Sequence, residues 1–284
     1  MNKNLKETIQ KIEWEIRLYN WIKKYNLWRE FNIVEKQVYS LQELNTIFLE
    51  LKKIDILGKR IKELPKEIGC LVNLESLNLF LNDIKILPKE IGYLVKLKSL
   101  DIANNKIIVL PKEIGSLVKL ESLDIAYNKI TTLPKEIGNL VNLEILYLVH
   151  NQIRILPKEI GSLSKLKELD LNDNKITALP KEIGSLINLK ICILSCNRIT
   201  TLCKEFGCLV NLEELVLCDN KITTLPKVIG ELVKLESLHL SENVLRYSKT
   251  KYYKIKIKYC DKILIMKIKY FVKVRQWNIL FNMV

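Results

Sequence analysis

Leucines recur along this chain in a pattern that repeats every 23 residues. In the unit spanning residues 133–155, Leu143, Leu146 and Leu148 form an L-x-x-L-x-L core. The last two leucines are two residues apart, the spacing that places side chains on one face of a β-strand. Tyr147 between them is expected to point to the opposite face. The pattern predicts one short strand per unit, and nine such cores follow one another in constant register.

One unit of this kind cannot fold alone, because it has nothing against which to bury its leucines. Stacked units solve the problem. Neighbouring strands would pair in parallel at a spacing of about 4.8 Å, and the leucines of successive units would form one continuous core. The hydrophobic pattern therefore predicts a solenoid.

Two further positions in the unit are nearly constant. A glycine follows each Leu-Pro-Lys-Glu-Ile segment, and we interpret it as permitting a tight or left-handed turn. An asparagine ends each strand segment, and a column of amides can bridge backbone groups of adjacent units. We interpret this column as a structural asparagine ladder, because a reactive group would not be needed eight times. Its members are Asn82, Asn105, Asn128, Asn151, Asn174, Asn197, Asn220 and Asn243.

The repeated sequence LPKEIGxLxxLxxLxLxxNxI resembles the 23-residue class of leucine-rich repeat, found in bacterial repeat proteins and in intracellular Ras-group and plant adaptors. The match covers residues 51–245. The resemblance implies an α/β fold, a right-handed, horseshoe-shaped leucine-rich-repeat solenoid with a concave parallel β-sheet and short helical or 3₁₀ turns on the convex side. Members mostly bind other proteins through the concave face. The resemblance thus implies a protein-binding scaffold for signal transduction rather than an enzyme.

The sequence divides into three regions. We expect residues 1–40 to form an N-terminal amphipathic helical cap, residues 41–245 the solenoid of about nine repeats, and residues 246–284 a basic tail. Apolar residues at spacings of three and four predict a helix over residues 4–30; they are Leu5, Ile9, Ile12, Ile16 and Tyr19, widened by Trp14, Trp21 and Trp28. A membrane-binding or partner-binding helix is the alternative. The nearly balanced charge of the segment favours the cap, since a membrane-bound helix would favour Lys and Arg.

The concave face of the predicted sheet is set by the residue between the two strand leucines. This column is acidic over its first two-thirds and apolar over its last third, with aromatic groups beside it. Such a surface favours a protein partner with a basic segment, although acids that only maintain solubility remain the alternative. The expected partner-binding residues are Asp101, Asp124, Tyr127, Tyr147, His150, Asp170, Asp173, Ile193 and Val216.

The net charge of +14 would suggest nucleic-acid binding if it were spread over the solenoid. Residues 246–284, however, hold eleven Lys or Arg and one acid, which accounts for +10 of the total. Nucleic-acid binding by the repeats is therefore not expected. Three interpretations of the tail stay open: a β-hairpin cap, a basic segment that contacts anionic membrane or nucleic acid, or sequence left by a lost reading frame.

No catalytic, cofactor or metal site is expected. The two histidines, His150 and His239, lie about four repeats apart, or about 19 Å at the usual strand spacing, and neither belongs to a known motif. The seven cysteines contain no C-x-x-C pair, and we interpret them as core or half-buried thiols of a reducing compartment. The sequence has no evident signal peptide and no apolar stretch of about 18 residues. We therefore expect a cytoplasmic protein.

Overall fold

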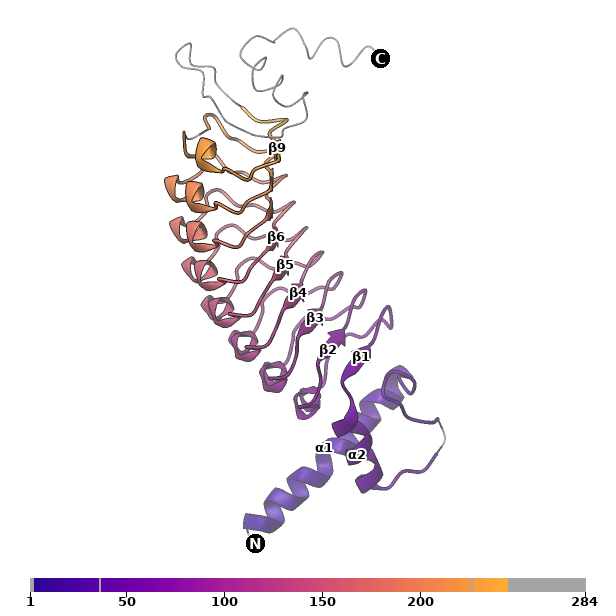
Figure 1. The fold of residues 1–284 in the computed structure, drawn as a ribbon. Helices are drawn as coiled ribbons and strands as arrows, with labels where there is room; N and C mark the ends of the chain where they lie inside the picture. Colours follow the sequence, from indigo (N-terminus) through magenta and orange to yellow (C-terminus); the bar gives the residue numbers. More distant parts are fainter. Residues whose placement is uncertain (1–2, 36, 226, 245–284) are drawn as a thin grey trace.

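The computed structural model describes residues 3–35, 37–225 and 227–244, with side chains from residue 14 onward. Within these residues, nine three-residue strands form one parallel sheet in which each strand pairs with the next along the chain (Figure 1). The strands are β1 (Lys53–Asp55), β2 (Ser76–Asn78), β3 (Ser99–Asp101), β4 (Ser122–Asp124), β5 (Ile145–Tyr147), β6 (Glu168–Asp170), β7 (Ile191–Ile193), β8 (Glu214–Val216) and β9 (Ser237–His239). The predicted solenoid and its register are confirmed.

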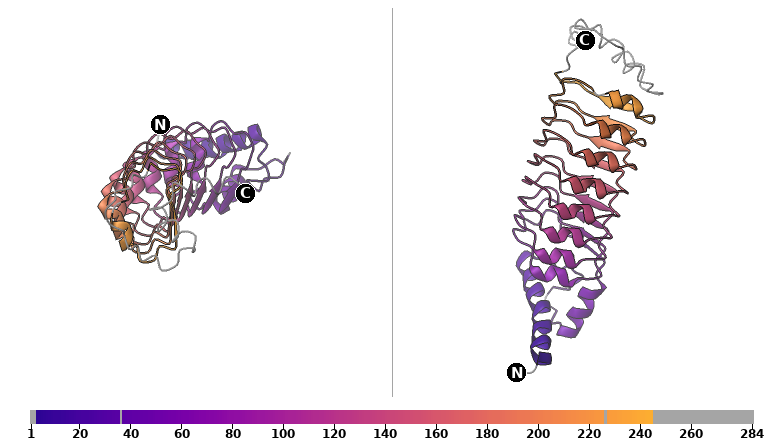
Figure 2. Two further views of the ribbon diagram at one scale, coloured as in Figure 1. Left: turned by 90° about the horizontal axis from the view of Figure 1, so that it is seen from above. Right: turned by 90° about the vertical axis from the view of Figure 1, so that its left-hand side faces the viewer.

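Short 3₁₀ helices form the opposite side of the solenoid. A proline stands at the N-cap of most of them in an extended conformation, as Pro88 does with φ −66° and ψ 145°, where its missing N–H removes no helical hydrogen bond. The right-hand view of Figure 2 shows them stacked in one column that faces the viewer. They are η1 (Lys66–Cys70), η2 (Lys89–Tyr93), η3 (Lys112–Ser116), η4 (Lys135–Asn139), η5 (Lys158–Ser162), η6 (Lys181–Ser185), η7 (Lys204–Cys208) and η8 (Lys227–Glu231). The sheet therefore lines the concave face and these helices the convex face.

The core is a set of continuous columns of leucine and isoleucine. The central residue of every strand is buried, as Leu123 and Leu146 show, and Cys192 replaces leucine at this position without becoming exposed. Each buried side chain packs against its equivalents in the units before and after, so the apolar stacking that stabilises one unit depends on its neighbours.

The asparagines of the ladder bond to the backbone around each bend. The Asn128 amide nitrogen donates to the carbonyl oxygens of Ile102, Ile125 and Ala126 at 3.0, 3.1 and 3.1 Å. Its oxygen accepts from the backbone N–H of Ile107 at 2.9 Å. One side chain thus satisfies four backbone groups around the bend and joins two units. All the ladder asparagines from Asn82 to Asn220 are buried.

The repeated glycine lies in a tight 3₁₀ turn, so only the left-handed alternative of its interpretation was wrong. Among the described glycines only Gly58 has positive φ, and Gly58 does not belong to that repeated position. A Cβ added to Gly115 would lie 2.4 Å from the carbonyl oxygen of Glu136 in the next unit. The glycine is therefore needed because two 3₁₀ helices approach closely, and not because the chain turns left-handed.

The N-terminal helix α1 (Lys3–Tyr25) covers the first turn of the solenoid, as a cap does. The Trp21 indole N–H donates to the carbonyl oxygen of Glu63 at 3.1 Å. The helix ends earlier than the predicted residue 30, because Asn26 takes a left-handed conformation (φ 52°) and terminates it. The buried side chains are Leu18, Trp21 and Ile22, whereas Ile16 is 43% exposed. Trp14 and Tyr19 are partly buried against the same core. The side chains of Leu5, Ile9 and Ile12 lie outside the described residues, so that part of the expected stripe is not tested.

A second helix, α2 (Leu41–Glu50), was not predicted and lies before β1. Ser40 and Glu43 form a capping box at its start, in which Ser40 Oγ accepts from the Glu43 backbone N–H. Phe48 is fully buried, as its alignment with the core position Leu71 one unit later requires. The basic tail of residues 246–284 lies outside the described residues, so none of its three interpretations is tested.

Candidate concave binding site

The concave face carries one outward-pointing side chain from the end of each strand. Register pairing places Asp101 beside Asp124, Asp124 beside Tyr147, and Tyr147 beside Asp170. Ile193 and Val216 continue the same column on β7 and β8. The change from acidic to apolar side chains that was read from the sequence is thus a change along one surface.

The three aspartates close the turns that follow their strands. Asp101, Asp124 and Asp170 each accept, through Oδ1, the backbone N–H two residues later at 2.9 Å. Asn78 occupies the same column on β2, and its Oδ1 accepts the N–H of Phe80 at the same distance. An uncharged amide therefore does the same structural work, and the fold does not require the negative charges.

These carboxylates are partly removed from water and have no cationic partner. Burial raises the pKa of Asp101, Asp124 and Asp170 above the ordinary value, and the hydrogen bond from the backbone offsets only part of this effect. For Asp124, the charges of Asp101 and Asp170 raise the pKa further. Among the described residues, no ion pair involves any of the three.

Acids just outside the sheet behave differently. Glu75 pairs with Lys98 at 2.8 Å, and Glu144 pairs with Lys167 at 2.7 Å. Each lysine comes from the unit after the glutamate, so these pairs run along the outer edge of the solenoid. These edge carboxylates are therefore paired, whereas those of Asp101, Asp124 and Asp170 at the centre of the sheet are not.

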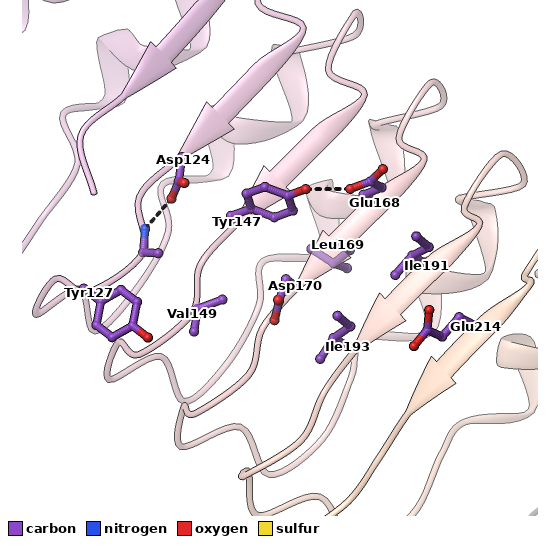
Figure 3. A pocket seen from close by; sticks show the side chains of 11 residues that line it. Asp124, Tyr127, Tyr147, Val149, Glu168, Leu169, Asp170, Ile191, Ile193 and Glu214 are labelled. Carbon is purple, nitrogen blue, oxygen red and sulfur yellow. Dashed lines mark hydrogen bonds between the residues drawn. The ribbon is translucent and has the colours of Figure 1, made fainter. Parts of the chain in front are cut away.

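A hollow of about 390 Å³ lies over strands β4 to β8 (Figure 3). Asp124 and Asp170 lie toward one end, and Ile191 and Ile193 lie toward the other, where Glu214 borders them on β8. Small side chains, those of Ala126 and Val149, leave room beside the aspartates. The lining residues are Asp124, Ala126, Tyr127, Tyr147, Val149, Glu168, Leu169, Asp170, Ile191, Ile193 and Glu214.

The position of the Tyr147 ring is fixed by a hydrogen bond. Its hydroxyl donates to Glu168 Oε2 at 2.6 Å (Figure 3). This bond, with burial as a smaller cause, raises the pKa of Tyr147 to about 12. The phenol consequently keeps its proton and the bond holds, which draws the ring diagonally from β5 toward the start of β6.

The rim of the hollow is formed by residues in left-handed turns. Tyr127 and His150 have φ of 52° and 53°, a conformation that is uncommon for bulky residues. Their rings stack with centroids 5.0 Å apart, and His150 Nδ1 contacts Asp173 Oδ2. Gly58 occupies this position in the first unit. The left-handed position was not recognised in the sequence because most units fill it with residues other than glycine.

The hollow brings together five of the expected partner-binding residues, namely Asp124, Tyr127, Tyr147, Asp170 and Ile193. Asp101, His150, Asp173 and Val216 lie on the same face outside its lining. The expected set did not contain the other six lining residues, which are Ala126, Val149, Glu168, Leu169, Ile191 and Glu214. Ala126 and Val149 each follow by one position the buried residue just after the strand, Ile125 or Leu148, and this constant offset is the signal that could have identified them.

The described residues contain no group of three His, Cys, Asp or Glu side chains placed to hold a metal ion. Burial raises the pKa of the Cys192 thiol to about 12, which makes it a poor nucleophile. The prediction of core or half-buried thiols was wrong for Cys196 and Cys208, which are exposed. In the part of the chain that the structure covers, no helix is long and apolar enough to cross a membrane.

Several solved structures resemble this chain. A leucine-rich-repeat protein of Leptospira interrogans is 35% identical with a TM-score of 0.67, over 80% of this chain and 63% of that one. The leucine-rich-repeat ectodomain of the Arabidopsis thaliana membrane receptor kinase GASSHO1/SCHENGEN3, in complex with Casparian strip integrity factor 2, is 31% identical with a TM-score of 0.64, over 68% of this chain and 24% of that one. The chain thus spans less than two-thirds of either protein.

An internalin of Listeria monocytogenes, 23% identical, shares the fold with a TM-score of 0.56, over 72% of this chain and 64% of that one. No curated protein sequence matches the chain. The family model described as a leucine-rich repeat region matches residues 12–127, 89–172, 111–191, 135–216 and 158–253. Leucine-rich-repeat folds are commonly scaffolds for protein interaction. Because these matches together extend over most of the sequence, the chain belongs to the leucine-rich repeat family.

Proposed function

We propose that this protein is a non-enzymatic scaffold that binds a protein partner through its concave face, and that the partner presents a basic segment. The observation that carries the proposal is the set of half-buried, unpaired carboxylates of Asp101, Asp124 and Asp170. A basic partner would supply the cations that these groups lack.

The comparison of Asp124 with Asn78 supports a role for the charge. Both side chains make the same bond to the backbone, so the turn is stable without a carboxylate. The fold does not need this negative charge, and burial opposes its ionisation. A cationic ligand that the charge attracts explains its presence. Complementary charge also speeds encounter with the partner and selects against acidic proteins.

The mechanism of binding is preorganisation. The strands that carry the contact residues are fixed by the sheet and by the asparagine ladder, so little conformational entropy is lost when a ligand binds. The Arabidopsis ectodomain, which has a similar fold, was solved in complex with another molecule. We extend binding to the present chain on the strength of its own concave face.

The test is an affinity pull-down from lysate with the intact chain and with an Asp101→Asn/Asp124→Asn/Asp170→Asn variant. Asparagine keeps the bond to the backbone, so the variant should fold while losing its basic partner. The matched control is Glu75→Gln/Glu144→Gln/Glu213→Gln, which removes the same number of charges from the paired outer edge. Retention of the same proteins by the aspartate variant would rule out the acidic column as the binding surface.

A second candidate function is peripheral binding to anionic membrane or nucleic acid through residues 246–284. It is favoured by the +10 charge of that segment. A chain that ends at Asn243 discriminates between the two functions. If the concave face is the binding surface, the shortened chain should keep its protein partners. If the tail is the binding surface, the shortened chain should no longer bind the anionic vesicles or nucleic acid that the intact chain binds at moderate salt.

We also propose a cytoplasmic location and a role in signal transduction. Support for the location comes from the free thiols of Cys70, Cys192, Cys196, Cys203, Cys208 and Cys218, since unpaired cysteines are typical of reducing compartments. Fractionation of the native cells tests this location, and recovery of the protein outside the cytoplasm would contradict it.

A further inference from the structure

The acidic end of the hollow has the composition of a site for one organic cation. Asp124 and Asp170 lie on either side of Tyr147 in the sheet register. The Tyr147 hydroxyl bonds to Glu168, so the ring points away from Asp124 (Figure 3). Tyr127 stands at the rim of the same hollow. Carboxylates combined with aromatic rings are the groups that bind ammonium and guanidinium ions.

The other end of the hollow combines two isoleucines with one carboxylate, because Glu214 on β8 lies beside Ile191. Ile191 and Ile193 project from β7 and form the wall beyond Asp170. An isoleucine or leucine of a ligand could bury its side chain there, and this contact would be worth more than tenfold in affinity if the side chain were fully buried. The hollow therefore offers two adjacent subsites of different chemistry.

The distance between the subsites selects a backbone conformation for the ligand. From the row of Tyr147 on β5 to that of Ile193 on β7 there are two strand intervals, or about 9.6 Å. In a polyproline II helix, residues i and i+3 lie on one face about 9.3 Å apart. In a β-strand, residues i and i+2 lie on one face about 6.8 Å apart. This distance matches neither one nor two of the spacings between neighbouring strands of the solenoid.

We propose that the hollow binds a polyproline II segment carrying Lys or Arg at one position and an aliphatic residue three positions away. The cation lies between Asp124 and Asp170, and the aliphatic side chain packs on Ile191 and Ile193. This inference rests on the proposed function and names the class of ligand that the concave face recognises.

Synthetic peptides test the spacing directly. The first probe is the blocked peptide Gly-Pro-Pro-Arg-Pro-Pro-Ile-Pro-Pro-Gly, studied with its reversed order of Arg and Ile because the direction of the ligand is open. The control is the isomer Gly-Pro-Pro-Arg-Pro-Ile-Pro-Pro-Pro-Gly, whose two side chains are two residues apart. Titration calorimetry with the full chain at low salt should show one of the three-residue peptides binding about tenfold more tightly than the isomer.

Three variants assign the two subsites. Asp124→Asn/Asp170→Asn should abolish binding of every peptide, whereas Glu75→Gln/Glu144→Gln, which removes the same number of charges from the paired outer edge, should leave binding within twofold. Ile193→Ala should leave the isomer's affinity unchanged and remove the preference for the three-residue spacing.

Equal affinity for the spaced peptides and the isomer would overturn the proposal, as would failure of all the peptides to bind. If the lysate partner still depends on Asp101, Asp124 and Asp170 in either case, the scaffold function stands and only the ligand class is wrong. If that partner is insensitive to the three aspartates, the proposed function itself fails.

Discussion

Two columns of side chains run the length of the solenoid only four residues apart in each unit, and they differ in almost every physical respect. The column that contains Asn128 is asparagine in eight successive units and is buried as far as Asn220. The column that contains Asp124 faces the concave side and changes from acid to tyrosine to isoleucine and valine. The first satisfies the backbone of every unit, and the second does not.

The difference teaches which positions the fold constrains. A buried amide that bonds to four backbone groups has no acceptable replacement, so each unit must repeat it. A concave side chain needs at most to accept one N–H, which Asn78 and Asp124 both do. The sheet therefore leaves its concave face free to vary, and the variation produces the hollow.

The largest effect on stability is expected from a substitution in the asparagine ladder. Asn128→Ala removes four hydrogen bonds and leaves the buried N–H of Ile107 without its partner, whereas each of the three carbonyl groups keeps one other hydrogen bond. We expect the free energy of unfolding to fall by about 3 kcal/mol, measured by urea denaturation. Asn142→Ala is the control, since this exposed amide donates only to Val118. Equal losses in the two variants would show that burial of the ladder has no special weight.

The next effect concerns the close approach of 3₁₀ helices. Gly115→Ala places a methyl group 2.4 Å from a carbonyl oxygen of the following unit, and the required displacement should cost about 2 kcal/mol. Gly230→Ala is the matched control, because its added methyl group meets nothing within 4 Å. We expect the control to be neutral or more stable by about 0.4–1 kcal/mol. Thermal unfolding of both variants shows whether glycine is required at this position by the close contact or by the conformational freedom of its backbone.

A smaller effect, in this case a gain in stability, is expected from a substitution on the concave face. The pKa of Asp124 is raised in the folded chain, so the folded state binds its proton more tightly than the unfolded state does. Ionisation then lowers stability as pH rises through the raised pKa. Asp124→Asn should therefore increase stability at neutral pH by up to about 0.5 kcal/mol. The gain in stability should disappear below about pH 4, near the pKa of an unfolded aspartate. Unfolding curves of both proteins at several pH values test this. A gain that stays the same at every pH would contradict it.

The smallest effect is expected at the outer edge. Glu75 and Lys98 form an exposed pair between neighbouring units, and such pairs contribute little because water and salt screen them. Replacing both by glutamine should leave the unfolding midpoint unchanged within error. A clear decrease would mean that the edge pairs help to hold the units together.

Much of the fold could be predicted from the sequence because its determinants lie within one period. Leu146 and Leu148 define the strand, and the repeated asparagine defines the bend. The role of Gly115 could not be predicted, because it depends on contact with Glu136 in another unit. The end of α1 was missed for a similar reason, since a single left-handed residue, Asn26, stops a pattern that otherwise continues.

The candidate site was predictable only as a surface. Alternation along the strands correctly placed Asp124, Tyr147, Asp170 and Ile193 on one face. The hollow in that surface was not predictable, because it depends on the orientation of the Tyr147 ring and on the small size of the Val149 side chain. Both are properties of side-chain packing between units rather than of the repeated pattern.

The most direct test of the account is the affinity of the Asp101→Asn/Asp124→Asn/Asp170→Asn variant for a partner captured by the intact chain, measured by calorimetry at low and moderate salt. The account predicts that affinity is largely lost and that its salt dependence becomes shallow, while the variant remains folded. Unchanged affinity with the same salt dependence would contradict it, because the concave carboxylates would then have no part in binding.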